Sequence, residues 1–384
     1  MSRQGAPLRL GMVGGGPGAF IGGVHRMAAR LDGRWNLVAG AFSSDPAVSQ
    51  DFGRSLGLEP ARAYGDWRTM ARAEAERPDG IEAVAVVTPN HLHAPIATAF
   101  LGAGVPVICD KPLTVDLAQA RALAGLVDQT GLPFVLTHNY SGYPMVREAR
   151  ALVQAGRLGR LRIVQVEYVQ DWLARDLTGN KQADWRGDPS RAGPGGALGD
   201  IATHAYHLSR FVTGARTAAL SADLATFVDG RRVDDNVHVQ LRFEGGARGQ
   251  LWASQVAPGA ANGLRLRIYG EDGGLEWSQE EPDLLRHAPL GEAPRLLRRG
   301  GPGLSLAAAA ATRLPAGHPE GYLEGFAQIY ADAAELIGAH RQGRSPDPLA
   351  RLAPGVGDGV EGVAFIEAVV ASHAADGVWT PLAA

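Results

Sequence analysis

Short β-rich runs alternate with helical patterns over the first 137 residues or so. The runs are "LRLGMVG", "WNLVAGAFS", "AVAVVTP", "VPVICD" and "PFVLTHN". Between them, segments 20–31, 91–103 and 114–130 carry apolar residues at three- and four-residue spacing, which is typical of amphipathic crossover helices. Such alternation indicates a parallel sheet covered by helices on both faces. The pattern therefore predicts a doubly wound α/β domain over residues 1–138.

The pattern changes after about residue 140. Strand-like runs at 161–171, 217–228, 234–243, 248–257 and 263–270 follow one another, with one convincing helix, 197–212, among them. This predicts an α+β domain over residues 139–384 with a large, mostly antiparallel open sheet. Residues 288–318, rich in Gly, Pro and Ala, are interpreted as a long loop that could order over a ligand. Two helices, near 319–341 and 355–374, are expected after it.

Composition favours a two-domain enzyme-like protein with a small ligand. A chain of 384 residues exceeds one ordinary core, and its formal charge of -3 argues against a nucleic-acid or membrane-surface partner. The N-terminal apolar run is too short for a signal peptide and no run approaches a membrane span, so a cytoplasmic location is expected. The single cysteine, Cys109, excludes an internal disulfide and is interpreted as a small buried hydrophobe rather than a reactive thiol.

A glycine-rich turn, "GGGPGAFIGGVH" at 14–25, follows the first predicted strand and opens a helix. Glycines there permit a tight turn, and the helix N-terminus offers N–H groups to a pyrophosphate, as in Rossmann dinucleotide-binding domains. The second strand ends at Ser43 and Ser44 without a carboxylate to read a ribose or repel a 2′-phosphate, and no arginine stands beside them. NAD is therefore favoured and NADP left open.

Two further strand ends carry polar side chains. "TPNHLHAP" at 88–95 places Asn90 and His93 at the carboxyl edge of the sheet, where ligands of open α/β sheets bind, although Asn90 could equally be only a helix N-cap. Lys111 follows the run "ICD". It is one of only two lysines, with Lys181, among 37 Lys and Arg residues, so a compact ammonium rather than positive charge alone is expected to matter there.

The segment "GDIATHAYH" at 199–207 places Asp200 and His204 four residues apart on a predicted helix. They share a face, so the carboxylate could orient the imidazole as a general base. An ordinary helix contact is the alternative. A third interpretation takes Asp200, His204 and His207 as metal ligands, and we disfavour it because a dinucleotide would already supply the chemistry.

Taken together, these motifs resemble the glucose-fructose oxidoreductase/inositol dehydrogenase (Gfo/Idh/MocA) family. The resemblance covers nearly the whole chain, including "TPNHLHA", "DKP", "WRGDPSRAGPGGALGD" and "HPEGYLEGF". It implies that Lys111, Asp200 and His204 form the catalytic group, and that the protein is a homodimer or homotetramer, for which an apolar face on the second sheet would be suitable. Asp110 departs from the family's usual glutamate. The glycine turn is about three residues longer than usual, so Gly22 rather than Ala19 is expected at its third small position.

These observations predict an NAD(P)-dependent oxidoreductase that transfers hydride between nicotinamide and a secondary alcohol of a sugar, sugar derivative or cyclic polyol. Alternatives are an NAD-dependent glycosidase acting through a transient keto-sugar, and a non-catalytic cofactor-sensing protein. The predicted cofactor site comprises Gly14, Gly16, Gly18, Ala19, Phe20, Ile21, Ser43, Ser44, Thr88, Pro89, Asn90, His93, Asp110, Lys111 and Asn139. The predicted substrate contacts are Tyr140, Tyr143, Trp172, Lys181, Arg186, His204 and His318. No metal is expected.

Overall fold

The computed structural model describes residues 6–177 and 179–382, but not the side chains of residues 181 and 182. The chain forms two compact units. The first comprises Met1–Asn139 and Phe326–Val360, and the second Tyr140–Gly325 and Glu361–Ala384. The sequence prediction placed all of 139–384 in one domain, whereas Phe326–Val360 packs with the first unit.

The first unit is built on a five-stranded parallel sheet. Its strands are β1 (Leu8–Gly14), β2 (Trp35–Ala41), β3 (Ala83–Val87), β4 (Val107–Cys109) and β5 (Phe134–Leu136), in the order β2-β1-β3-β4-β5. All four pairings are parallel. Every residue of β3, "AVAVV", is buried because helices cover both faces. The doubly wound fold is confirmed.

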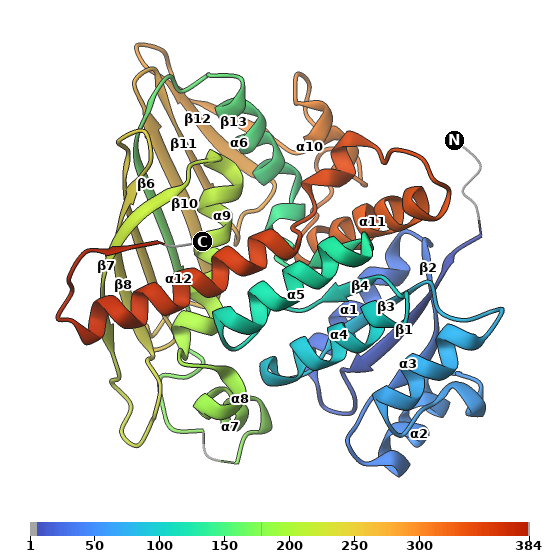
Figure 1. Cartoon of the computed structure of the whole chain (residues 1–384). Helices are drawn as coiled ribbons and strands as arrows, with labels where there is room; N and C mark the ends of the chain where they lie inside the picture. The colour runs from blue at the N-terminus through green and yellow to red at the C-terminus, as the bar shows by residue number, and fades with distance from the viewer. Residues whose placement is uncertain (1–5, 178, 383–384) are drawn as a thin grey trace. The chain divides into compact units, whose positions relative to one another are not determined.

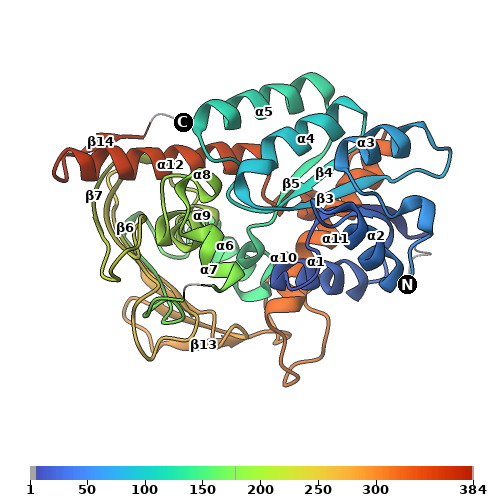
Figure 2. The same ribbon diagram turned by 90° about the horizontal axis from the view of Figure 1, so that it is seen from below.

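Helices of this unit lie on both sides of the sheet (Figure 2). On one side are α4 (His93–Gly102) and α5 (Leu117–Thr130), and on the other α1 (Phe20–Leu31) and α11 (Tyr322–Arg341). Two helices absent from the prediction, α2 (Pro46–Ser55) and α3 (Trp67–Glu76), also belong to this unit. The sequence analysis did not predict these helices because their sequences are mostly polar and show no clear apolar spacing. Asp45 and Asp66 cap their N-termini, as is common at helix starts.

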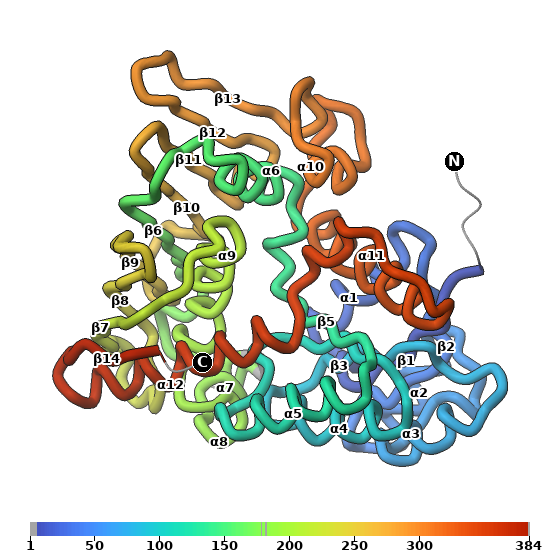
Figure 3. The backbone as a smooth tube through the Cα atoms, turned by 45° about the horizontal axis from the view of Figure 1, so that its top comes forward, coloured from blue at the N-terminus to red at the C-terminus, as the bar shows by residue number. Residues whose placement is uncertain are grey.

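The second unit contains a nine-stranded sheet, whose order from β13 to β14 can be followed in Figure 3. Five strands lie near their predicted ranges: β6 (Leu161–Val169), β7 (Thr217–Ala225), β8 (Asn236–Phe243), β9 (Arg248–Ser254) and β10 (Gly263–Gly270). The strands β11 (Gly273–Ser278), β12 (Leu284–Pro289), β13 (Arg295–Arg298) and β14 (Thr380–Pro381) extend it. Only β6 and β9 pair in parallel, which confirms a mostly antiparallel sheet.

One face of this sheet is covered by α6 (Pro144–Gln154) and α9 (Thr203–Thr213), as Figure 1 shows. Shorter helices α7 (Lys181–Arg186) and α8 (Pro189–Ala192) precede α9, and α12 (Val356–Ala374) ends the helical part of the chain. The opposite face of the sheet is mainly polar, with Glu167, Arg265 and Arg267 beside the exposed Ile163 and Tyr269. This face is therefore not the all-apolar surface that would suit an oligomer.

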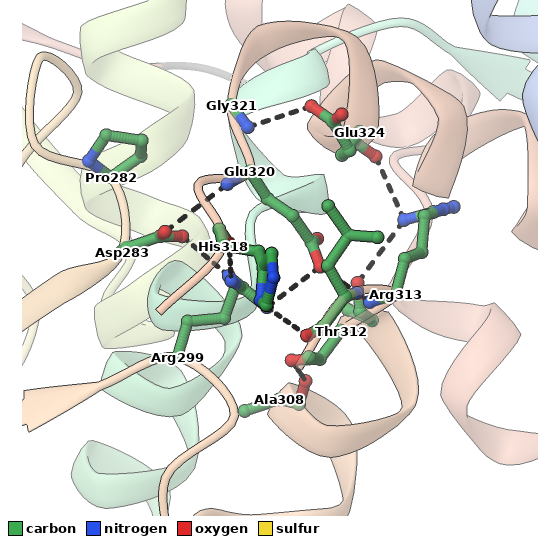
Figure 4. Close-up of polar contacts among 12 residues, drawn as sticks. Pro282, Asp283, Arg299, Ala308, Thr312, Arg313, His318, Glu320, Gly321 and Glu324 are labelled. Atoms are coloured by element: carbon green, nitrogen blue, oxygen red, sulfur yellow. Dashed lines mark hydrogen bonds and ion pairs between the residues drawn. The ribbon is translucent and has the colours of Figure 1, made fainter. Parts of the chain in front are cut away.

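The segment 288–318 is not a long loop. It contains the end of β12, all of β13 and the helix α10 (Leu306–Ala311). A buried ionic network holds this segment in place (Figure 4): the Arg299 guanidinium, 1% exposed, donates to Asp283 at 2.7 Å and to Glu320 at 2.8 Å. The same Glu320 oxygen also accepts from the backbone N–H groups of Arg313 and Leu314. Charged residues thus order a sequence that composition alone marks as loop.

Replacing Arg299 with leucine is expected to destabilise the protein by about 3 kcal/mol or more, because the buried Glu320 carboxylate and the partly exposed Asp283 carboxylate lose their partner. The matched control is Arg295→Leu. Its ion pair with Glu292 is exposed, and its loss should cost less than about 1 kcal/mol. Urea denaturation of both variants checks the difference, and equal midpoints would contradict a structural role for the network.

Within the two described ranges, we find no helix that combines the length and the apolar character needed to cross a membrane.

Candidate active site

The glycine turn forms a tight cradle between β1 and α1. Gly14, Gly15 and Gly18 adopt positive φ values of 84°, 65° and 74°, which other residues rarely tolerate. A side chain on Gly22 would lie 2.3 Å from the Gly15 Cα, so the helix and the turn touch backbone to backbone. This supports Gly22 rather than Ala19 as the third small position. The α1 N-terminus has no side-chain cap and no acidic residue in its first turn, which suits an anionic ligand.

We expect Gly22→Ala to weaken NADH binding by about tenfold or more, because its methyl group must push the turn away from the helix. Gly23→Ala is the matched control, since a Cβ at the neighbouring position meets nothing within 4 Å. It should bind NADH normally and gain slightly in stability. NADH fluorescence titration and thermal unfolding measure both effects, and equal binding by the two variants would contradict the proposed packing.

The carboxylate nearest the end of β2, that of Asp45, is engaged in a helix cap and is not available to bind a ribose. The Asp45 side chain accepts from the N–H groups of Ala47 and Val48 at 2.9 and 3.2 Å and so caps α2. Ser43 accepts from the Asp45 N–H at 3.1 Å, and Ser44 is exposed. The tip of the strand therefore offers hydroxyl groups, as the sequence predicted.

His93 joins the loops that follow β3 and β4. Its ring is fully buried, with Nδ1 2.8 Å from the Pro112 carbonyl and Nε2 2.9 Å from the Thr88 carbonyl. Burial lowers the pKa of this imidazole, and the nearby Asp110 charge opposes that shift. We therefore expect His93 to hold the loops that carry Thr88 and Pro112 in place, rather than to contact the cofactor through its ring. Asn90, 6% exposed, is not an N-cap, since Pro89 occupies the N-cap position of the 3-10 helix Asn90–Leu92 and Leu92 that of α4.

Asp110 directly follows β4, and Lys111 is the next residue, at the carboxyl edge of the sheet. The Asp110 carboxylate accepts from the Lys111 backbone N–H and from the Thr137 hydroxyl, both at 2.9 Å. Burial raises the pKa of Asp110, but its interactions with His25 and Lys111 outweigh burial and hold that pKa well below the usual range. A permanent negative charge therefore stands next to Lys111.

Three polar atoms at this edge suit a ligand. Thr88 Oγ1, His91 Nδ1 and Asn139 Nδ2 are buried with no hydrogen-bond partner among the described residues. Buried polar atoms normally have partners, so their positions beside a glycine cradle fit a polar cofactor. Thr88 and Asn139 were both predicted from the sequence to contact it. His91 was missed, although it stands in the same "TPNHLHAP" motif.

In the second unit, Asp200 and His204 straddle a change of helix type. Asp200 lies in a π-helical turn, Leu198–Ala202, and His204 in the first turn of α9. Single π-turns within helices occur frequently at functional sites. The Asp234 carboxylate accepts from the Gly196 and Leu198 N–H groups at 2.7 and 2.8 Å, which fixes the start of this turn. Burial raises the pKa of Asp234 to about 6.

The Asp200 carboxylate is held by two donors. Arg186 Nε lies 3.1 Å and Gln255 Nε2 2.8 Å from the same oxygen, Oδ2. The Arg186 guanidinium also lies 4.5 Å from the Trp185 ring and 5.7 Å from the Trp172 ring. Arg186, predicted as a substrate contact, thus serves Asp200 in this structure.

Aromatic rings and polar side chains surround His204, which is 8% exposed. The Tyr140 and Tyr168 rings lie 5.0 and 6.2 Å from the imidazole. The two tyrosine hydroxyls are 2.5 Å apart, and that of Tyr168 donates to Asn262 at 2.8 Å. Burial raises the pKa of Tyr140 to about 12, so its hydroxyl keeps its proton. The imidazole therefore stands among neutral hydrogen-bonding groups.

The remaining predicted substrate residues differ in their surroundings. Tyr143 is 1% exposed, and its ring packs against Trp277 at 5.5 Å, which gives it a core role. The His318 side chain is exposed, while its carbonyl accepts from Arg299. The side chain of Lys181 lies outside the described residues.

Sequence reasoning missed Gln170, Gln255 and Asn262. Gln170 and Gln255 directly follow β6 and β9, which pair in parallel up to Val169 and Ser254. Their side chains bind Asn262 and Asp200 respectively. Polar residues at the ends of neighbouring parallel strands were the available signal, but β6 and β9 are far apart in the chain and their pairing is visible only in the fold.

The predicted catalytic group draws on both units, with Lys111 in the first and Asp200 and His204 in the second. In the part of the chain that the structure describes, no three His, Cys, Asp or Glu side chains are grouped to hold a metal ion.

Two family models match the chain. The model for the oxidoreductase family with an NAD-binding Rossmann fold matches residues 8–138, and the GFO/IDH/MocA C-terminal domain matches residues 146–276. The chain is 31% identical to levoglucosan dehydrogenase of Pseudarthrobacter phenanthrenivorans over 73% of this chain and 76% of that protein.

Solved structures agree with this assignment. An oxidoreductase from Sinorhizobium meliloti is 51% identical, with a TM-score of 0.89 over 97% of this chain and 99% of that one. An inositol dehydrogenase homologue from Azotobacter vinelandii, complexed with NADH and myo-inositol, is 36% identical, with a TM-score of 0.91 over 99% and 98%. The glycine cradle, the strand-end polar groups and these matches lead to one conclusion: the chain is an NAD-binding oxidoreductase of the Gfo/Idh/MocA family.

Proposed function

We propose that the protein catalyses reversible, NAD-dependent oxidation of a secondary alcohol in a sugar, a sugar derivative or a cyclic polyol. The observation that carries this proposal is the His204 imidazole, which lies beside the Tyr140 and Tyr168 rings and one helical turn after the anchored Asp200 carboxylate. That setting provides a proton acceptor together with hydrogen-bonding groups for neighbouring hydroxyls. The levoglucosan dehydrogenase relative and the neighbour complexed with myo-inositol support the substrate class.

Different residues remove the proton of the substrate hydroxyl and stabilise the negative charge on its oxygen. The bound dinucleotide supplies the hydride acceptor. His204 takes the hydroxyl proton in the oxidative direction, and Asp200 orients the imidazole and stabilises its positive charge. The Lys111 ammonium stabilises the negative charge that develops on the substrate oxygen.

The contacts of Asp200 suit this role. Arg186 and Gln255 both donate to Oδ2 and fix the carboxylate, so it keeps one orientation. We propose that the hydrogen-bonded series Tyr140, Tyr168 and Asn262, with Gln170 joined to Asn262, binds other substrate hydroxyls. Trp172, predicted as a substrate contact, would pack against the apolar face of the ring. Each of these groups is neutral, which favours a neutral polyol over a sugar acid.

We propose NAD rather than NADP as the preferred cofactor, because the serines at the end of β2 provide no cation to bind a 2′-phosphate. We also propose a homodimer or homotetramer, and sedimentation velocity measures its mass.

A substrate screen tests the function directly. Sugars, anhydrosugars, inositols and sugar acids are each incubated with NAD and with NADP, and nicotinamide absorbance is followed. NAD reduction with a neutral sugar or polyol is expected. Release of nitrophenol from a nitrophenyl glycoside with catalytic NAD and no accumulation of NADH would instead indicate a glycosidase. Dinucleotide binding without turnover on the whole panel would contradict the proposal.

A further inference from the structure

His25 is a buried histidine on α1 that the mechanism above does not use. Its side chain is 0% exposed, and its ring packs edge-on against Phe326 and Tyr330, with centroid distances of 4.7 and 5.8 Å. Its Nδ1 atom lies 2.7 Å from the Tyr330 hydroxyl. A buried, hydrogen-bonded imidazole fixed by an aromatic cluster can hold a neighbouring group in a defined orientation.

The neighbouring group is Asp110, the residue before Lys111. One carboxylate oxygen, Oδ1, accepts from the Lys111 backbone N–H and from Thr137. The other, Oδ2, lies 3.8 Å from His25 Nε2. This distance is too long for a hydrogen bond but short enough for electrostatic attraction. Three groups thus lie close to the carboxylate, and one of them is the backbone N–H of Lys111 itself.

The hydrogen bond with the Tyr330 hydroxyl sets the tautomer of the His25 imidazole. Burial, together with the Asp110 charge, raises the pKa of Tyr330 well above its usual range, so the hydroxyl keeps its proton. When it donates to Nδ1, the single hydrogen of a neutral imidazole lies on Nε2. That hydrogen is therefore on the nitrogen that lies 3.8 Å from Asp110 Oδ2.

We propose that His25, held by Tyr330, is a positioning residue for Lys111: its Nε2–H fixes the Asp110 carboxylate, which in turn fixes the backbone that carries the lysine. This inference rests on the proposed function, in which Lys111 acts on the substrate. It gives a reason for a histidine inside α1 and for a tyrosine on α11, segments about 300 residues apart.

Two substitutions of His25 separate positioning from packing. Glutamine places its amide nitrogen near the position of Nε2 and keeps a donor toward Asp110, whereas asparagine keeps a polar atom near Nδ1 and loses that donor. We expect His25→Gln to retain kcat within about threefold and His25→Asn to lower it by about tenfold, with little change in the KM for NAD. Tyr330→Phe, which removes one hydroxyl, should lower kcat in the same direction but less.

The scarcity of lysine provides a readout that needs no substrate. Reductive methylation with ¹³C-formaldehyde labels Lys111, Lys181 and the N-terminus, and the Lys111 signal is the one lost in Lys111→Arg. We expect this signal to shift in His25→Asn and Tyr330→Phe and to stay at its native position in His25→Gln. The NMR experiment tests the inference even if the substrate screen fails and the proposed function falls.

Two results would overturn the inference. One is native kcat and a native Lys111 signal in His25→Asn. The other is equal loss of kcat in the glutamine and asparagine variants with the Lys111 signal unmoved in both, since that outcome means His25 serves packing alone.

Discussion

Lys111→Arg is expected to lower kcat by about 10²- to 10³-fold, nearly as far as Lys111→Ala. Arginine preserves the charge, but its wide planar guanidinium cannot aim one compact donor at one oxygen. The setting of Lys111 strengthens this expectation, because the Asp110 carboxylate holds the lysine backbone at 2.9 Å and leaves little freedom to accommodate a longer side chain. Steady-state kinetics with the substrate found in the screen measures the effect.

The control for this substitution exchanges lysine and arginine at a position away from the proposed active site. Arg72 lies exposed on α3 of the same unit, and Arg72→Lys should turn over at the native rate. NADH binding should survive in Lys111→Arg, which separates catalysis from a folding defect. Native turnover by Lys111→Arg would mean that Lys111 supplies only positive charge.

His204→Asn is expected to lower kcat by about 10²- to 10⁴-fold, because the substrate hydroxyl loses its proton acceptor. Asparagine keeps a polar side chain between Tyr140 and Tyr168 but cannot take up a proton. The acidic limb of the pH profile of kcat/KM should vanish with it, since His204 must be unprotonated to act as the base. Kinetics across the neutral pH range, on both sides of the ordinary histidine pKa, tests both parts.

The matched substitution is His340→Asn, at an exposed position near the end of α11, which should leave kcat and the pH profile unchanged. If His204→Asn retains the acidic limb, a residue other than His204 is the base, and the assignment of His204 is wrong.

Local sequence patterns were sufficient wherever one element decides the outcome. The helix 20–31 was predicted with the bounds that α1 has, because its apolar spacing and its glycine start are both local. The segments that carry Asn90 and Lys111 were expected at the carboxyl ends of strands, and they follow β3 and β4 in the structure, because all strands of a parallel sheet end together. The helix predicted near 355–374 matches α12, because its apolar run is also a local signal. The helices α2 and α3 were missed because their faces are mostly polar.

Long-range contacts account for the errors. The strand β13 and helix α10 form in a Gly- and Pro-rich stretch because Arg299 reaches Glu320, a pairing that no local pattern encodes. Arg186 was interpreted as a substrate contact because it stands in a polar segment before the catalytic helix. In the structure its guanidinium binds Asp200, 14 residues later, which the sequence did not indicate.

The sequence by itself determined the two architectures, the glycine cradle and the candidate chemistry of Lys111, Asp200 and His204, because periodicity and residue type are local properties. The tertiary structure decided which side chains hold those groups: Gln255 and Arg186 on Asp200, Thr137 and His25 around Asp110, Tyr140 and Tyr168 beside His204. These partners come from strands and helices that meet only after folding. Hydrogen-bond geometry depends on distances in space, and separation along the chain does not fix those distances.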